Sequence, residues 1–331
     1  MSELEKEPAP STPIVIEKFS DPDWTAKGEL RAFVPLSQLD TLWINTGTLC
    51  NIECVNCYIE SSPENDRLSY ISTKEVIVFL DEIEQDGLGT REIGFTGGEP
   101  FMNPQFLEII ETTLGRGFDI LILTNAMKPL QRKKIQHALL DLQARFGQQI
   151  TLRVSLDHYT RKLHDLERGA GSFDKAIDGI NWLSRNGFSL NIAGRTMWHE
   201  QEDKERNGYG ELIKAQNWSI DAQNPGQLIL FPEMDEKSDV PEITEACWGL
   251  LNIRPDAMMC ATSRMVIKRK AADRAQIVPC TLIAYENAFE MGHSLAEAAK
   301  ADGGMFAKGA VKLCHPYCAK FCVLGGGSCS A

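Results

Sequence analysis

Short apolar runs alternate with amphipathic stretches between about residue 39 and residue 235. The runs that predict buried strands are TLWIN (41–45), EIGFT (92–96), DILILTNA (119–126), QITLRVSLD (149–157), FSLNIAG (188–194) and QLILF (227–231). Stretches with a helical period lie between them, at 72–87, from 103 onward, at 129–147 and at 172–187. Strands that alternate with helices predict βα units and a parallel sheet.

The first helical stretch carries both a start and a stop signal. Ser72 and Glu75 have the spacing of a capping box, and Gly87 suits the helix end. Between them, apolar residues recur at the spacing of one helix face, at Val76, Phe79, Leu80 and Ile83. We therefore expect a helix that begins after Ser72 and packs on the sheet.

The length of the alternating region sets the number of βα units. A complete eight-unit barrel takes about 250 residues, so about 195 residues supply about six units. We expect an α/β fold, a partial and open (β/α)6 barrel of the TIM type. A doubly wound open sheet remains the alternative, because the same pattern fits it.

The charged, proline-bearing stretch PEMDEKSDVPE (232–242) predicts the end of this module. Beyond it, MMCATSRMVIKRK (258–270) and AQIVPCTLI (275–283) predict the strands of a hairpin, and SLAEAAKAD (294–302) predicts a short helix. We expect an N-terminal extension over residues 1–38, partly disordered, a core over 39–235, and a small cysteine-rich α+β domain over 236–331.

The net charge and the N-terminal residues argue against a nucleic-acid-binding, membrane-bound or secreted protein. The formal net charge is -12 and the pI is about 5.1, so neither nucleic acid nor an anionic membrane is an expected partner. The first residues form no apolar secretory signal, and no apolar run reaches the roughly 18 residues of a membrane span. We expect a cytoplasmic protein with no membrane span.

The cysteines fall into two groups. Three of the ten stand at 50, 54 and 57, and seven lie in the last quarter of the chain: Cys247, Cys260, Cys280, Cys314, Cys318, Cys322 and Cys329. Because the cytosol keeps thiols reduced, metal ligation or redox chemistry explains these residues better than disulfides do. Their clustering predicts two separate metal-binding regions.

The first group, in CNIECVNCY (50–58), has three thiols and no fourth cysteine nearby. A buried helix face is one interpretation, but glycine and asparagine make the segment a poor helix. Structural zinc uses four protein ligands and would need a remote cysteine. The remaining option is a 4Fe-4S cubane with three irons held by Cys50, Cys54 and Cys57, and with the fourth iron open.

Four segments resemble a known family. CNIECVNCY resembles the CxxxCxxC signature of the radical S-adenosylmethionine (radical SAM) enzymes, and GFTGGEPFMNPQFLEII (94–110) resembles their GGEP motif. LTNA (123–126) and the region 155–180 are similar to their third-strand and fourth-strand segments. The resemblance spans about residues 39–200. It implies that the open iron chelates S-adenosylmethionine, whose reductive cleavage gives a 5′-deoxyadenosyl radical that abstracts hydrogen from a substrate.

The same resemblance gives roles to the GGEP segment. Gly97 and Gly98 let the backbone approach a ligand closely, or form a tight turn. Glu99 accepts hydrogen bonds from the ammonium group of S-adenosylmethionine, with a solvated carboxylate as the alternative. Tyr58 packs on adenine, although many family members carry an aromatic residue where Asn56 stands here.

Further polar residues stand at the ends of successive predicted strands, where barrel enzymes bind ligands: Asn125, Ser155, Asp157 and Arg195. By position, Ser155 and Asp157 are candidates for ribose or substrate hydroxyls, and Arg195 for the methionine carboxylate. Structural hydrogen bonds at strand ends are the alternative for each.

The C-terminal cysteines resemble the SPASM or twitch domains of some radical SAM enzymes, which bind auxiliary 4Fe-4S clusters. One cluster takes four ligands, most simply Cys260, Cys280 and two of Cys314, Cys318, Cys322 and Cys329. A second cluster would have an open iron or a ligand such as His315. The spacing departs from the usual SPASM pattern, and a zinc knuckle of the last four cysteines is the alternative.

The sequence thus predicts a radical SAM enzyme of the oxidoreductase type that oxidises or cross-links a peptide or protein side chain. A dehydrogenase of a small molecule is the second candidate, and an iron-sulfur electron carrier or scaffold without catalysis is the third. A flavodoxin- or ferredoxin-type protein is the expected electron donor.

Overall fold

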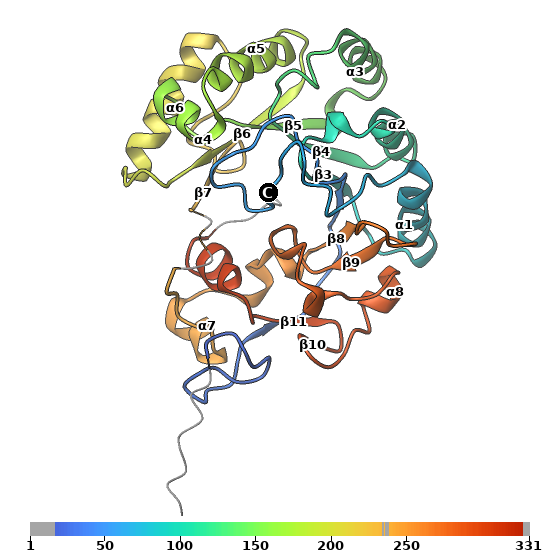
Figure 1. Ribbon diagram of the computed structural model, residues 1–331, viewed down its shortest axis with the longest axis vertical. Helices are drawn as coiled ribbons and strands as arrows, with labels where there is room; N and C mark the ends of the chain where they lie inside the picture. Colours follow the sequence, from blue (N-terminus) through green and yellow to red (C-terminus); the bar gives the residue numbers. More distant parts are fainter. Residues whose placement is uncertain (1–16, 234, 236–237, 327–331) are drawn as a thin grey trace, which may run out of the picture.

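The computed structural model of the chain describes residues 17–233, 235 and 238–326. Its main element is an eight-stranded sheet in the order β7-β6-β5-β4-β3-β2-β8-β9 (Figure 1). Strands β2 to β7 pair in parallel, as does β8 with β2, and β9 is antiparallel to β8. The strands are β2 (Thr41–Asn45), β3 (Glu92–Thr96), β4 (Asp119–Thr124), β5 (Ile150–Ser155), β6 (Ser189–Arg195), β7 (Leu228–Phe231), β8 (Ser263–Ile267) and β9 (Gln276–Val278).

The six predicted core strands are all present and lie in sequence order, so the predicted partial (β/α)6 barrel is confirmed. Helices lie outside the curved sheet (Figure 1). They are α1 (Thr73–Asp86), α2 (Phe106–Gly115), α3 (Lys133–Phe146), α4 (Arg161–Arg168), α5 (Ser172–Arg185) and α6 (Glu202–Gln216). The order β3-β2-β8 shows that the barrel stays open and that its first strand is covered by the C-terminal part.

Helix α1 forms as its sequence predicts. Ser72 caps its N-terminus in a capping box with Glu75, and Gly87 ends it in the left-handed conformation, with φ of 59°. Its buried residues include the four apolar positions of the predicted face. Helices α4 and α6 were not predicted, because their sequences are mostly polar; α6 buries only Glu205, Tyr209 and Ile213.

The predicted C-terminal hairpin is present as β8 and β9, but it extends the core sheet, with Thr41 opposite Ser263. A second sheet has the order β1-β11-β10. Its strands are β1 (Phe33–Val34), β10 (Phe306–Ala307) and β11 (Ala310–Lys312). Two α-helices, α7 (Glu245–Leu251) and α8 (Leu295–Ala298), and a π-helical segment, η7 (Cys318–Val323), also belong to this part.

Short 3-10 turns complete the described elements: η1 (Pro100–Met102), η2 (Gly147–Gln149), η3 (Pro255–Ala257), η4 (Met259–Ala261), η5 (Thr281–Ile283) and η6 (Asn287–Phe289). Part of the predicted N-terminal extension packs with the C-terminal residues, since β1 pairs with β11 and buried Arg31 pairs with Glu242 at 2.6 Å. Residues 1–16 of that extension lie outside the described residues.

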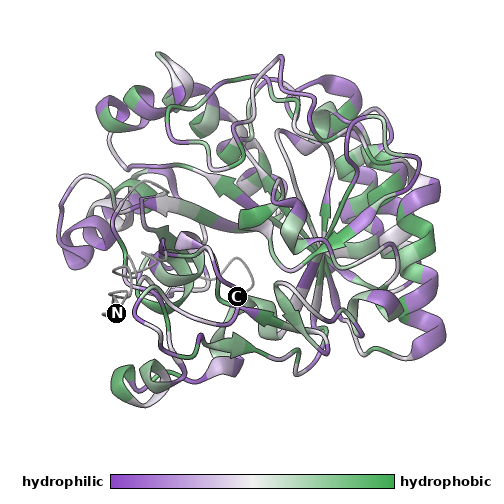
Figure 2. Cartoon of the chain, turned by 60° about the horizontal axis from the view of Figure 1, so that its bottom comes forward, coloured by the Kyte–Doolittle hydropathy of each residue, from purple (hydrophilic) through white to green (hydrophobic). Residues whose placement is uncertain are grey.

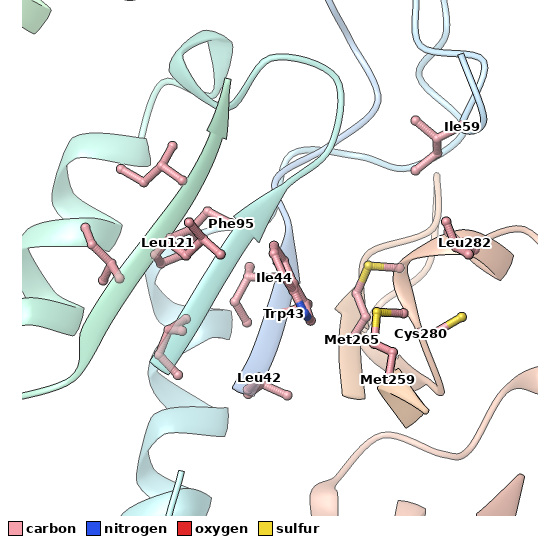
Figure 3. Close-up of a cluster of buried hydrophobic side chains, with 14 of the residues drawn as sticks. Leu42, Trp43, Ile44, Ile59, Phe95, Leu121, Met259, Met265, Cys280 and Leu282 are labelled. Carbon is pink, nitrogen blue, oxygen red and sulfur yellow. The ribbon is translucent and has the colours of Figure 1, made fainter. Parts of the chain in front are cut away.

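One apolar core runs through both parts of the chain. The strands are coloured mainly as hydrophobic and the outer helices carry hydrophilic faces (Figure 2). Leu42, Trp43, Ile44, Phe95 and Leu121 lie beside Met259, Met265, Cys280 and Leu282 of the C-terminal part (Figure 3). Across the described chain, no helix is both long and apolar enough to span a membrane.

Candidate active site

The cysteine loop between β2 and α1 brings its three thiols to one pocket at the carboxyl ends of the core strands. Every residue predicted for this site lines the pocket except Glu99. The lining residues are Cys50, Cys54, Cys57, Tyr58, Ile59, Ser61, Thr96, Gly97, Gly98, Leu123, Thr124, Asn125, Arg153, Ser155, Asp157, Arg168, Ala193, Gly194, Arg195, Phe231, Leu282 and Phe321. Residues from the ends of five strands, from the cysteine loop and from the C-terminal part therefore meet in one place.

The thiols of the loop are held in a buried, polar setting. Burial raises the pKa of Cys50 to about 12, with a further contribution from the Glu99 charge. Burial also raises the pKa of Cys54 to about 11, against the lowering effect of Arg168. The Cys57 sulfur accepts a hydrogen bond from the Ser61 backbone N–H at 3.3 Å. Cys50 and Cys54 thus keep their protons at neutral pH until a metal displaces them.

The two glycines of the GGEP segment accommodate the cysteine loop itself. A Cβ atom on Gly97 would lie 2.4 Å from the Gly47 carbonyl oxygen, and one on Gly98 would lie 2.2 Å from the Leu49 carbonyl oxygen. The Gly98 N–H donates to Gly47 at 2.8 Å, and the Glu99 N–H donates to Leu49 at 3.2 Å. The close approach that the sequence predicts is therefore made by the backbone that leads into Cys50.

Glu99 is buried, with a relative exposure of 1%, and does not line the pocket. Its carboxylate accepts hydrogen bonds from the Thr124 hydroxyl (2.9 and 3.0 Å), from the Asn125 N–H (2.9 Å) and from the Phe101 N–H (3.3 Å). Burial raises the pKa of Glu99 to about 7 although these hydrogen bonds lower it. The carboxylate joins the ends of β3 and β4 in this structure, and its predicted contact with an ammonium group stays a prediction.

Asn125 and Tyr58 connect the cysteine loop to the strand ends. The Asn125 amide donates to the Asn51 side-chain oxygen at 3.0 Å and approaches the Cys50 sulfur at 3.9 Å. The Tyr58 hydroxyl lies 3.5 Å from the Thr96 hydroxyl. Asn125 thus holds the cysteine loop through a hydrogen bond, while Tyr58 lines the pocket.

Asp157 and Arg195 lie at the other side of the pocket, and a residue that sequence reasoning did not single out joins them. Arg168 of α4 binds Asp157 through two hydrogen bonds, at 2.6 and 2.9 Å. The pKa of buried Asp157 is lowered because the Arg168 and Arg195 charges outweigh the effect of burial. Ser155 lines the same wall. Asp157 is therefore ionised and already engaged by an arginine.

Arg195 retains donor capacity. Its Nη2 donates to the Asn56 carbonyl oxygen at 3.1 Å, and its Nε lies 3.9 Å from Asp157. Its Nη1 is buried and makes no hydrogen bond in the described structure. A buried guanidinium N–H that faces a pocket without an acceptor suits an anionic ligand group.

Glu167, which the sequence did not identify, binds the segment between Cys54 and Cys57. Its carboxylate accepts hydrogen bonds from the Asn56 backbone and side-chain amides, both at 2.8 Å, and its carbonyl oxygen accepts from the Val55 N–H at 2.9 Å. A polar residue in a mostly polar helix gives no sequence signal of this role.

The remaining wall is apolar and comes from distant segments. Phe231, Leu282 and Phe321 line the pocket, and the rings of Phe231 and Phe321 stack with their centroids 5.5 Å apart. Phe321 belongs to η7, between Cys318 and Cys322. The C-terminal cysteine region thus contributes directly to the pocket.

A comparison with protein families decides the identity of this site. The model of the Radical SAM superfamily matches residues 44–212, just over half of the chain. The chain belongs to the radical SAM superfamily. Its matched region contains the cysteine loop, the GGEP segment and all the polar strand-end residues described above, so the resemblance found in the sequence is confirmed.

Curated relatives cover this chain in part. The antilisterial bacteriocin subtilosin biosynthesis protein AlbA of Bacillus subtilis (strain 168) is 33% identical over 193 residues, which is 56% of this chain and 40% of AlbA. Mycofactocin maturase MftC of Mycobacterium tuberculosis (strain ATCC 25618 / H37Rv) is 29% identical over 140 residues, which is 42% of this chain and 33% of MftC. The chain thus matches less than half the length of either relative.

Solved structures share the fold. Streptococcus suis SuiB bound to precursor peptide SuiA has a TM-score of 0.59 at 15% identity, over 81% of this chain and 66% of that chain. Native anSMEcpe with bound AdoMet has a TM-score of 0.57 at 14% identity, over 79% of this chain and 81% of that chain. At these identities the likeness extends to the fold alone.

The residues present fit the cofactors of a radical SAM enzyme, a 4Fe-4S cluster and S-adenosylmethionine. Three thiols on one loop, with no fourth cysteine among the described residues that line the pocket, would hold three irons of a cubane and leave one open. The orphaned Nη1 of Arg195 lies in the wall of the same pocket. In the described chain, no three His, Cys, Asp or Glu side chains are placed to hold a single metal ion.

The C-terminal cysteines form a second set of thiols. Cys260, Cys280 and Cys314 are buried, and the charges of all three raise the pKa of Cys318, after the larger effect of burial. These four residues are therefore near one another, although they come from three separate segments: Cys260, Cys280, and the stretch from Cys314 to Cys318. All nine cysteines that the structure describes are thiols without a disulfide.

The other C-terminal candidates have different surroundings. The sulfur of Cys247 lies 3.4 Å from the Thr244 N–H at the start of α7, where it caps the helix. His315 accepts a hydrogen bond from the Tyr317 N–H at 3.1 Å, and burial lowers its pKa to about 4. Cys322 is half-buried on η7, and Cys329 lies outside the described residues.

Proposed function

We propose that this radical SAM enzyme oxidises or cross-links a side chain of a peptide or protein. When bound, the cluster and S-adenosylmethionine supply a 5′-deoxyadenosyl radical that abstracts a hydrogen atom from the substrate. The observation that carries the proposal is the pocket itself. It joins the three-thiol loop, the polar strand ends and an apolar wall from the cysteine-rich C-terminal part.

The chain's own residues divide the work in this pocket. Cys50, Cys54 and Cys57 hold the cluster, and the orphaned N–H of Arg195 suits the methionine carboxylate. Ser155 and Tyr58 remain candidates for the ribose and the adenine. Asp157 holds Arg168 beside the cysteines, so we assign it a positioning role rather than direct contact with a hydroxyl group.

The C-terminal set supports an oxidative outcome. We propose that Cys260, Cys280, Cys314 and Cys318 ligate one auxiliary 4Fe-4S cluster, because the first three are buried near Cys318 and because Phe321, next to this set, reaches the pocket. Removing a hydrogen atom and then an electron from a substrate requires an electron acceptor, and an iron-sulfur cluster is one.

A peptide substrate is favoured by the relatives. AlbA is named for the biosynthesis of a bacteriocin and MftC is named a maturase. A small-molecule dehydrogenase is the second candidate, and an electron carrier without catalysis would have no need of the ligand pocket. We expect a flavodoxin- or ferredoxin-type donor and a cytoplasmic location.

The test uses anaerobically reconstituted protein, dithionite and S-adenosylmethionine, with 5′-deoxyadenosine as the readout. We expect product from the wild type and none from the triple variant Cys50→Ala/Cys54→Ala/Cys57→Ala. Absence of product from wild type with a reduced cluster refutes the catalytic proposal.

The substrate test adds any short peptide that is encoded beside this chain, together with candidate small molecules, and measures the mass of each peptide after the reaction. Loss of two hydrogen atoms from one peptide supports the peptide assignment. Faster 5′-deoxyadenosine formation with a small molecule, and with none of the peptides, favours the dehydrogenase.

A further inference from the structure

Arg264 on β8 is a buried cation that lacks a carboxylate partner. Its relative exposure is 2%, and it is among the largest fully buried side chains. Its guanidinium donates to the carbonyl oxygens of Cys260 (2.5 Å), Ser263 (2.7 Å) and Gly309 (3.1 Å). Among the ion pairs of the described residues, none includes Arg264.

Two other arginines inside the described chain, buried Arg31 and part-buried Arg168, do have carboxylate partners. Arg31 pairs with Glu242 at 2.6 Å, and Arg168 pairs with Asp157 at 2.6 Å. A buried charge without a partner costs several kcal/mol, so proteins neutralise such charges or use them. Carbonyl oxygens satisfy the N–H groups of Arg264, but they carry no formal charge.

The strand register shows which cysteines lie close to Arg264 along the hairpin. In the β8–β9 hairpin Met265 stands opposite Val278, so continuing the register places Ser263 opposite Cys280. Cys260 lies in the turn η4, just before β8. Arg264 is therefore at the end of the hairpin that carries both cysteines, and Figure 3 shows Cys280 at the edge of the buried cluster there.

The guanidinium lies against the proposed ligand set. It donates to the carbonyl oxygen of Cys260, four residues earlier in the chain, and Cys280 is near enough to interact with it electrostatically. Four thiolates around a 4Fe-4S core leave a net negative charge on the cluster, which grows when the cluster is reduced. This anion is the missing partner of the buried cation.

We propose that Arg264 is the built-in counter-charge of the auxiliary cluster and raises its reduction potential. This inference rests on the proposed auxiliary cluster. Net charge near a cluster is one of the factors that set its potential. A positive charge favours the more negative, reduced state, so its removal lowers the potential.

The experiment isolates the auxiliary cluster in the background Cys50→Ala/Cys54→Ala/Cys57→Ala and titrates it by EPR at controlled potential. Arg264→Gln removes the charge and keeps amide donors for the carbonyl oxygens; Arg264→Met is a second neutral variant, and Arg264→Lys keeps the charge. Arg206→Met is the matched control, since Arg206 also donates to two carbonyl oxygens (of Ala222 and Leu228) but lies on α6.

We expect the neutral variants to keep their iron and to show about a tenfold lower ratio of reduced to oxidised cluster at a given potential, a shift of about 59 mV to more negative values. Arg264→Lys and Arg206→Met should titrate like the background. A second supporting result is loss of iron from the two neutral variants and its retention in Arg264→Lys, while circular dichroism shows that all the apo-proteins are folded. The positive charge of Arg264 is then needed to retain the cluster.

Other results would overturn the proposed role of Arg264. An unchanged potential in the neutral variants removes the electrostatic role, and loss of iron from Arg264→Lys as well removes the role of charge. Unfolding of both neutral variants, with the lysine variant folded, assigns the charge to the fold instead. Absence of iron and sulfide from the background itself refutes the auxiliary cluster of the proposed function, and this is distinguishable from failure of the Arg264 assignment alone.

Discussion

The close packing of Gly98 against the cysteine loop allows a sharp test of how the first cluster site is built. In Gly98→Ala, the new Cβ would lie 2.2 Å from the Leu49 carbonyl oxygen, 2.6 Å from its carbon and 2.8 Å from the Thr48 oxygen. Ordinary contact begins at 3.4 Å, so the alanine Cβ and the Leu49 oxygen must move apart by up to 1.2 Å. All three atoms are backbone, and no side-chain rotation relieves the contact.

This displacement is passed to Cys50, the next residue in the chain. A shift of about 1 Å in a positioned group is enough to cost about a hundredfold in rate. We expect Gly98→Ala to lose the iron of the first site, so that its iron content falls to that of the Cys50/Cys54/Cys57 triple alanine variant. Formation of 5′-deoxyadenosine should fall at least about a hundredfold.

The control is Gly115→Ala in α2, where an added Cβ meets nothing within 4 Å. This variant should keep the iron content and the rate of the wild type. Full iron content in Gly98→Ala, with a rate within about threefold of the wild type, refutes the view that this close approach fixes the loop; thermal unfolding of both apo-proteins shows whether the fold survives.

Three further predictions concern buried carboxylates. Glu167→Ala removes both acceptors of the Asn56 amides, and we expect lower iron retention after gel filtration, whereas retention equal to the wild type contradicts the assigned role. Glu242→Gln leaves the buried Arg31 charge unpaired and should destabilise the apo-protein by about 3 kcal/mol in urea unfolding. The pKa of Glu242 is lower in the folded protein than in the unfolded chain. The stabilisation by its ion pair is therefore fully present above the unfolded pKa of about 4.3 and is lost as the pH falls through the folded pKa. Glu242→Gln should not show this loss of stability at acidic pH. Burial raises the pKa of Glu205 to about 7, and neither of its carboxylate oxygens has a hydrogen-bond partner in the described structure. The free energy of unfolding of the wild type should therefore fall by at least about 1 kcal/mol between pH 4.5 and 7 relative to Glu205→Gln. Equal pH profiles of the two proteins contradict this prediction.

The elements that the sequence predicted correctly are those whose local pattern agrees with the fold. Strand β2 is a run buried at every position, the central residues of β3 and β4 are apolar and mostly buried, and α1 carries its own capping signals. The alternation itself sets the parallel order, because short right-handed βα connections place each strand beside the last. Helix α6 escaped notice because its packing depends on Tyr209 and a buried Glu205, and not on a continuous apolar face.

The site residues divide in the same way, into those with a local sequence signal and those that only the fold brings into place. Cysteines and glycines were identified because their chemistry or conformation is unusual at those positions. Glu167 and Arg168 were not, since charged residues on a polar helix normally face solvent, and only the fold brings α4 against the cysteine loop. The close approach at Gly97 and Gly98 was predicted for a ligand or a tight turn; the structure adds the loop backbone as a close neighbour, and the contact with a ligand stays a prediction.

The two sets of thiols differ in the charges around them. This difference predicts which of the two clusters has the higher reduction potential. Beside the first set, the Arg168 and Arg195 cations are matched by the Asp157 and Glu99 carboxyl groups, and Glu99 acts directly on Cys50. Beside the second set, Arg264 has no carboxylate partner among the described residues. If net charge dominates, a cluster at the second set is reduced at the higher potential and is the better electron acceptor. A titration of the wild type in which the first cluster is reduced at the higher potential contradicts this order.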